Sequence, residues 1–258
     1  MMDRTVGRYG WKADLPDYRD KKFTAAAPVS LPPAVDLRGK CPPIYDQGDL
    51  GSCVGNAVAG ALQFERMQQF ATPNYVPSRL FIYYNARVIE GTADSDSGAE
   101  IRDGIKAIAS LGAPSEDAWP YDVTQFATKP PDADYTAALQ DKALEYDSLD
   151  NTVVDQLRNC LALGFPFPFG FSVYESFQSD AVASTGVVPM PGPNEGMVGG
   201  HAVLCVGYDH TSHVFLVRNS WGLEWGQGGY FSLPYDYLTN SDLASDAWRL
   251  RLIGRPSV

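Results

Sequence analysis

The spacing of apolar residues divides the chain into a helical first half and a strand-rich second half. Helical spacing predicts helices over residues 53–70, 78–90 and 99–111, and a fourth that is capped by Asn151 and ended by Gly164. Runs of aromatic and β-branched residues predict strands over residues 165–174, 201–209, 213–220, 229–233 and 247–253. Helices followed by strands predict an α+β protein with two segregated lobes.

Residues 1–30 show neither a helical nor a strand period, so we expect an N-terminal extension there and one folded body over residues 31–258. The formal net charge is −11, and it is unevenly spread. The extension carries six basic and four acidic side chains, a net of +2, which leaves −13 on the body. An acidic body argues against a nucleic-acid partner and against an anionic membrane surface.

No apolar run approaches the ~18 residues of a membrane helix, and the first ten residues lack the apolar core of a secretory signal. We therefore expect a monomer that is cytoplasmic, or exported by a route not visible in this chain. The four cysteines are too few and too irregularly spaced for a disulfide framework, and none forms a zinc-binding pair. We expect no metal and no cofactor.

Cys53 stands at the predicted start of the central helix, where peptide dipoles and free N–H groups lower a thiol pKa. Gly48 and Gly51 allow the tight turn that would present this thiol to a substrate. The alternative is that Cys53 is a buried small apolar residue. Among three histidines, His201 begins an apolar strand, and Asn219 ends another. An amide that holds one imidazole nitrogen leaves the other for a thiol, although Asn219 is also a common turn residue.

These residues belong to longer motifs that come in a recognisable order. The motifs are Gln47-Gly48, Gly51-Ser52-Cys53, His201-Ala202-Val203, Val206-Gly207-Tyr208, Arg218-Asn219-Ser220-Trp221-Gly222 and Trp225-Gly226-Gln227-Gly228-Gly229. In this set and order the sequence resembles the papain-like cysteine peptidases over about residues 31–258. His201 follows Cys53 by 148 residues, which lies within the roughly 130 to 150 expected.

The resemblance implies a helical lobe with a central helix, an antiparallel barrel-like β lobe, and an active site in the cleft between them. It assigns the attack on the peptide carbonyl to Cys53 and the proton transfers to His201. Asn219 would orient the imidazole, and Trp221 would shield that hydrogen bond. The Gln47 side chain and the Cys53 backbone N–H would form the oxyanion hole. A peptide or protein is the expected substrate.

The resemblance also suggests residues that bind the substrate. These are Ser97, Gly98, Gly200, Ala202 and Trp221. The pocket bordered by Ala202 and residues 169–173 would take the residue two before the scissile bond, with an apolar preference. Residues 94–98 replace the family's glycine-rich segment, and we interpret them as a solvated loop that lacks a full calcium ligand series.

Two departures from the family pattern concern cysteines. Leu50 stands where the family has a cysteine before the nucleophile, so the usual disulfide cannot form. A bridge between Cys41 and Cys160 is one hypothesis, and free thiols are the other.

The extension is much shorter than the family's helical pro-region. Its charge and its aromatic residues, Trp11 and Tyr18 among them, suggest that residues 1–30 lie in or near the cleft and act as an intramolecular inhibitor. The alternative is a disordered tail. For the whole chain, the alternatives to a peptidase are a silent binding or inhibitory protein on the same scaffold, or a Cys/His amidase or acyltransferase.

Overall fold

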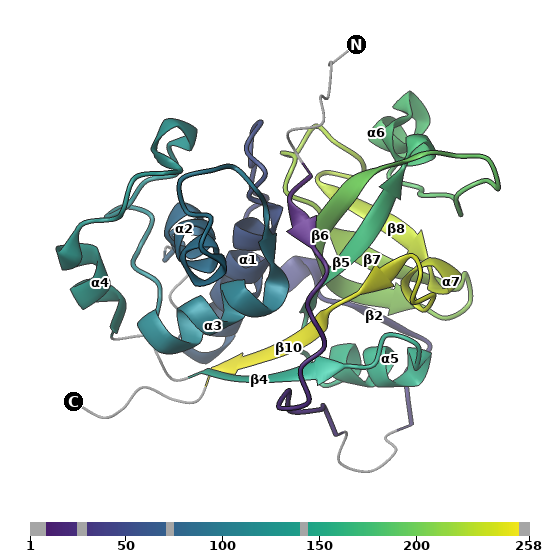
Figure 1. Ribbon diagram of the computed structural model, residues 1–258. Helices are drawn as coiled ribbons and strands as arrows, with labels where there is room; N and C mark the ends of the chain where they lie inside the picture. The colour runs from purple at the N-terminus through teal and green to yellow at the C-terminus, as the bar shows by residue number, and fades with distance from the viewer. Residues whose placement is uncertain (1–8, 25–29, 71–74, 140–143, 253–258) are drawn as a thin grey trace.

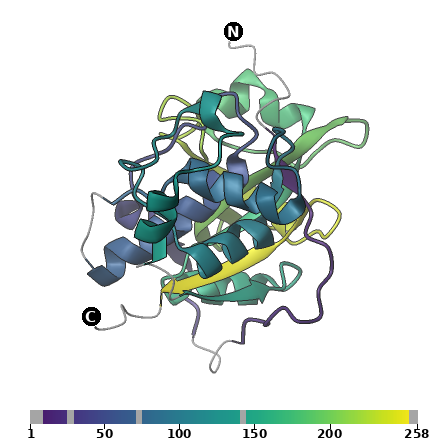
Figure 2. The ribbon, with the colours of Figure 1, turned by 60° about the vertical axis from the view of Figure 1, so that its left-hand side comes forward.

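A computed structural model describes residues 9–24, 30–70, 75–139 and 144–252 of the chain. The first lobe is helical and contains α1 (Cys53–Phe70), α2 (Arg79–Glu90), α3 (Ile101–Leu111) and the short α4 (Asp132–Ala138). Figure 1 shows these helices gathered on one side of the molecule, and the turned view of Figure 2 shows them in front of the strands. The predicted helix over residues 53–70 is confirmed at both ends.

The central position of α1 follows from its apolar surface. Its residues 53–66 are all buried, and the helix packs on α2, on α3 and on the sheet of the second lobe. Gly55 permits the close approach of α2, because a Cβ atom there would lie 2.7 Å from the Arg79 carbonyl oxygen. Ser78 caps α2 by accepting the Phe81 N–H, so the helix starts one residue later than predicted, and Gly91 ends it in the left-handed region.

The second lobe is an antiparallel sheet of six strands. The order is β8 (Tyr230–Pro234), β7 (Val214–Arg218), β6 (Met197–Asp209), β5 (Phe167–Tyr174) and β9 (Ala244–Ser245), with β2 (Ala34–Asp36) also paired to β6. Three short helices, α5 (Val154–Ala162), α6 (Asp180–Thr185) and α7 (Tyr235–Leu238), accompany it. The strands β4 (Leu144–Leu149) and β10 (Ala247–Leu252) form a separate antiparallel pair. The predicted α+β class with two segregated lobes is therefore confirmed.

The N-terminal segment enters between the lobes. Its strand β1 (Trp11–Lys12) pairs in parallel with β3 (Ala99–Glu100), and Figure 1 shows β1 at the junction of the two lobes. The prediction that a helix starts at residue 99 is therefore wrong by two residues. The Ala99 N–H donates to the Gly10 carbonyl oxygen at 2.7 Å instead of belonging to the helix.

Three further expectations are wrong for local reasons. Asn151 does not cap α5, because its side-chain amide donates to the carbonyl oxygens of Leu238 and Ala244. Cys41 and Cys160 do not form a bridge, since all four cysteines are free thiols. Tyr18 is not an apolar anchor, because 99% of its surface is exposed.

Candidate active site

Cys53 is the first residue of α1, and its side chain is completely buried. The loop before it is tied to the β lobe, because the Gln47 N–H donates to the Ser220 carbonyl oxygen at 2.9 Å. The same loop is tied to the helical lobe through the Gly51 N–H, which donates to the Asp96 carboxylate at 3.1 Å. The thiol thus stands where the two lobes meet.

His201 and Asn219 come from neighbouring strands and meet at 2.8 Å between His201 Nε2 and Asn219 Oδ1. Asn219 Oδ1 also accepts the Ser220 N–H at 2.8 Å, which fixes it as the oxygen of the amide. Nε2 must therefore carry the proton and donate it. Nδ1 has no hydrogen-bond partner among the described residues. The indole of Trp221 stacks on the imidazole, with ring centroids 4.9 Å apart.

The strand β6 that carries His201 passes close to Cys53. The backbone N–H of Ala202, the next residue, faces the Cys53 sulfur. With Nε2 held by Asn219, the free lone pair of Nδ1 is the one available to take the thiol proton. The arrangement can therefore generate a thiolate and an imidazolium.

The Gln47 side chain is buried and held at both ends of its amide. Its Oε1 accepts the Ser220 hydroxyl at 2.6 Å, and its Nε2 donates to the Leu50 carbonyl oxygen at 2.9 Å. A fixed amide N–H in the loop that leads to Cys53 is the kind of preorganised donor that stabilises an oxyanion.

In this structure the Cys53 thiol and the His201 imidazole are both in their neutral forms. Burial raises the pKa of Cys53 to about 11, against the lowering effect of the Ala202 and Gly10 N–H groups. Burial also lowers the pKa of His201 to about 4, although the hydrogen bond to Asn219 acts in the opposite direction. Near pH 7 neither group is charged, because water is excluded from both.

Residues 9–11 of the N-terminal segment provide part of the surface that buries Cys53 and His201. The Tyr9 ring makes edge contacts with His201 and Trp221, with centroids 6.1 and 6.0 Å apart. Gly10 lies so close to the nucleophile loop that a Cβ atom there would be 1.8 Å from the Gly51 carbonyl oxygen. The N-terminal segment therefore crosses the site directly above the thiol.

Of the five residues expected to bind substrate, four contact this segment, and the fifth, Ala202, faces the thiol. A Cβ atom at Gly98 would lie 2.2 Å from the Gly10 carbonyl oxygen, and one at Gly200 would lie 2.6 Å from the Trp11 carbonyl oxygen. Ala202 faces the thiol through its N–H, and Trp221 contacts Tyr9. Ser97 also contacts the segment, because its hydroxyl accepts a hydrogen bond from Lys12 Nζ at 3.4 Å, and it donates to the Thr92 hydroxyl at 2.9 Å.

The acidic loop over residues 94–98 is not a purely solvated loop. Asp96 holds the Gly51 N–H and the Tyr83 hydroxyl, and the buried Arg87 guanidinium donates to the carbonyl oxygens of Ala93 and Ser95. Sequence reasoning missed this role of Asp96, because its partners are distant in the chain. The described residues contain no cluster of three His, Cys, Asp or Glu side chains that could hold a metal ion.

Sequence reasoning also missed the polar contacts of the N-terminal segment. Asp14, 3% exposed, accepts the indole N–H of Trp248 at 2.9 Å and the Arg102 backbone N–H at 3.1 Å. Asp246 accepts the indole N–H of Trp11 at 2.9 Å. These partners lie more than 80 residues apart in the chain, so no local pattern marks them.

Comparison with known proteins gives concordant results. The family model described as "Papain family cysteine protease" matches residues 31–248. Xylellain, a cysteine protease from Xylella fastidiosa, superposes with a TM-score of 0.90 and 43% identity, over 98% of this chain and 99% of that one. A peptidase C1-like protein of Acanthamoeba polyphaga mimivirus, itself uncharacterized, is 44% identical over 99% of this chain and 82% of its own length.

More distant relatives are longer than this chain. Cathepsin J of Mus musculus is 25% identical over 84% of this chain, and the match spans 64% of its own length.

No described helix is long and apolar enough to cross a membrane. The family model covers most of the chain, and two relatives exceed 40% identity over nearly all of it. The chain belongs to the papain family of cysteine proteases.

Proposed function

We propose that the protein is a cysteine peptidase that hydrolyses peptide bonds through a thiolate–imidazolium pair and an acyl-enzyme. The observation that carries this proposal is the hydrogen bond of 2.8 Å between His201 Nε2 and Asn219 Oδ1. It leaves Nδ1 as the nitrogen free to act as a base toward Cys53. The place of Cys53 at the start of α1 favours the thiolate once the burial that raises the pKa of this thiol is relieved.

In the first half of the reaction, His201 takes the thiol proton and the Cys53 sulfur attacks the peptide carbonyl carbon. The oxyanion accepts hydrogen bonds from the Cys53 backbone N–H and the Gln47 amide. The C–N bond then breaks, and the imidazolium gives its proton to the leaving amine. In the second half, water attacks the thioester, loses a proton to His201, and releases the acid as the C–S bond breaks.

We further propose that the N-terminal segment holds the enzyme inactive. Gly10 presents its N–H to the thiol, and its carbonyl oxygen is taken by the Ala99 N–H at 2.7 Å. The Gly10 carbonyl is therefore not directed at the oxyanion donors, so the segment can occupy the site without being cleaved. The parallel pairing of β1 with β3 fixes this orientation.

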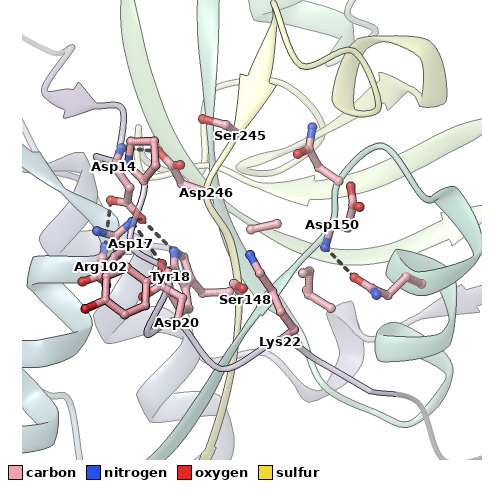
Figure 3. A pocket seen from close by; sticks show the side chains of 16 residues that line it. Asp14, Asp17, Tyr18, Asp20, Lys22, Arg102, Ser148, Asp150, Ser245 and Asp246 are labelled. Atoms are coloured by element: carbon pink, nitrogen blue, oxygen red, sulfur yellow. Dashed lines mark hydrogen bonds and ion pairs between the residues drawn. The ribbon is translucent and has the colours of Figure 1, made fainter.

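Polar contacts on both sides of β1 hold the segment in place. Lys12 forms an ion pair with Glu90 at 2.7 Å. Arg102 pairs with Asp20 at 3.2 Å and with Asp14 at 3.8 Å, and Figure 3 shows the three side chains together beside Asp246. The Arg102 pairs join side chains that are at most 12% exposed, so they support a held segment more strongly than exposed charges would.

Turnover of a peptide library, followed by mass spectrometry, tests the peptidase proposal. We expect cleavage by the Trp11→Ala variant of the full chain and none by the same variant with Cys53→Ser. Cys41→Ser is the matched control, because it removes a thiol outside the site. Hydrolysis of small amides alone would favour the amidase, and binding without any turnover would favour the silent scaffold.

A further inference from the structure

The loop that leads to Cys53, the nucleophile loop of residues 47–52, has no covalent cross-link. Leu50 stands where the family has a disulfide-forming cysteine, and all four cysteines of the chain are free thiols. Hydrogen bonds must therefore hold this loop on the helical lobe. The Tyr121 hydroxyl holds its first residue by donating to the Gln47 carbonyl oxygen at 2.9 Å. The middle of the loop has a different partner.

The peptide group that joins Leu50 to Gly51 is held at both of its polar atoms. Its carbonyl oxygen accepts Gln47 Nε2 at 2.9 Å. Its N–H donates to the Asp96 carboxylate, at 3.2 Å to Oδ1 and 3.1 Å to Oδ2. Gly51 is buried, and a Cβ atom there would lie 3.0 Å from Asp96 Oδ1, so the carboxylate packs directly on this glycine. Asp96 and the Gln47 amide thus bind the same peptide group.

The Asp96 carboxylate also reaches the edge on which the N-terminal segment lies. Asp96 accepts the Tyr83 hydroxyl proton, and the Tyr83 oxygen accepts the Gly98 N–H at 3.1 Å. Gly98 and Ala99 form the peptide-binding edge, since the Ala99 N–H donates to the Gly10 carbonyl oxygen at 2.7 Å. Asp96 therefore connects the nucleophile loop to the peptide-binding edge through one tyrosine.

The buried Arg87 guanidinium fixes both Asp96 and Tyr83. It donates to the carbonyl oxygens of Ala93 and Ser95, at 2.9 and 2.6 Å, in the loop that carries Asp96. Its Nε donates to the Tyr83 carbonyl oxygen at 3.2 Å, and the guanidinium lies 4.0 Å from the centre of the Tyr83 ring. These contacts place the carboxylate before any substrate binds.

We infer that Asp96 is a positioning residue that holds the nucleophile loop in register with the peptide-binding edge, in a chain where Leu50 excludes the family's disulfide. Without the carboxylate, the buried Gly51 N–H would lose its partner and the Leu50–Gly51 peptide would be free to rotate. The Leu50 carbonyl oxygen would then no longer hold the Gln47 amide, and a displaced oxyanion donor slows catalysis. This inference rests on the proposed function, because it concerns the same reaction.

The test measures kcat and KM for a fluorogenic peptide in full-chain Trp11→Ala. We expect Asp96→Ala to lower kcat about tenfold and to change KM by less than about threefold. Residual closure by the segment competes with the substrate, so it changes the apparent KM and not kcat at saturation. Asp96→Asn keeps the Oδ1 acceptor and should restore kcat to within about threefold of the parent. Asp94→Ala, which removes an exposed carboxylate from the same loop, should leave both constants within about twofold.

Tyr83→Phe is a second variant that keeps the buried ring and leaves Gly51 bound to Asp96. It removes the acceptor of the Gly98 N–H, so we expect KM to rise about fivefold while kcat stays within about twofold. An unchanged KM would overturn the link to the peptide-binding edge. An unchanged kcat in Asp96→Ala, or a loss that Asp96→Asn does not restore, would overturn the positioning role and keep the peptidase.

A peptide aldehyde gives a readout that needs no turnover. The Cys53 sulfur bonds to the aldehyde carbon, and the thiol proton passes to the carbonyl oxygen, which faces the oxyanion donors. Asp96→Ala should weaken aldehyde binding about tenfold and binding of the matching peptide alcohol by less than about threefold. This pattern without hydrolysis of any peptide would keep the positioning role and refute the peptidase. Equal aldehyde affinity in Asp96→Ala and its parent would overturn the positioning role.

Discussion

Replacing Trp11 by alanine should release the N-terminal segment and expose Cys53. The indole is partly buried against Gly170 and Gly200, and its N–H donates to Asp246 at 2.9 Å. Fully buried Trp→Ala changes cost ~3–5 kcal/mol, so a half-buried indole accounts for about 2 kcal/mol. The hydrogen bond adds about 1 kcal/mol. The closed form should lose about 3 kcal/mol, which is roughly a hundredfold in its population.

The rate of Cys53 labelling by an epoxysuccinyl inhibitor measures this population, because only the open form presents the thiol. We expect a roughly hundredfold faster second-order rate for Trp11→Ala than for the natural chain. The increase stops once the open form predominates. Tyr18→Ala is the matched control, since it removes an aromatic side chain from the same segment that is 99% exposed. Equal rates for the natural chain and both variants would refute the reasoning.

Three further predictions concern Asp14 of the N-terminal segment, the imidazole of His201 and the packing of Trp11 on Gly170. Burial and the neighbouring Asp246 raise the pKa of Asp14 to about 7, so the closed form binds a proton that the released form loses near pH 3.8. Closure is then strongest below pH 3.8 and weakens as the pH rises towards 7. The rate of Cys53 labelling in the natural chain, divided by the rate in Asp14→Asn, should therefore increase from pH 4 to 8. A ratio that does not change with pH would contradict this prediction. Asn219→Ala should lower kcat/KM by roughly 10²-fold or more, because the His201 imidazole loses its orientation. Steady-state kinetics measures this loss, and an unchanged circular dichroism spectrum shows that the variant is folded. Gly170→Ala should expel Trp11, since the new Cβ would overlap the indole at 2.0 Å, and unchanged indole fluorescence would count against it.

The catalytic residues could be chosen from the sequence because each lies in a short local motif. Cys53 follows a glycine turn and opens an apolar helix, and Asn219 directly follows the end of β7. The prediction that His201 begins its strand is wrong, because β6 already starts at Met197. The bounds of α1 and the order of helices before strands follow from apolar spacing alone. Those features depend on neighbours in the chain, which the sequence displays.

The rest of the site depends on contacts between distant segments. Ala99 and Glu100 carry helical spacing, yet they pair with Trp11 and Lys12 because the N-terminal segment offers a carbonyl oxygen. Asn151 has the residue type of a helix cap but bonds to carbonyl oxygens 87 and 93 residues away. The hydrogen bond from Trp11 to Asp246 has no sequence signal, because the two residues meet only in the folded chain.

The central claim is that the enzyme is a peptidase restrained by its own N-terminal segment. The most direct test compares peptide hydrolysis by the full chain with that by residues 31–258, after thermal unfolding shows that the shortened chain is folded. We expect turnover only from the shortened form, and its loss when a synthetic peptide of residues 9–24 is added back. Equal turnover by both forms, unaffected by that peptide, would contradict the restraint, and a folded shortened form without turnover would contradict the peptidase.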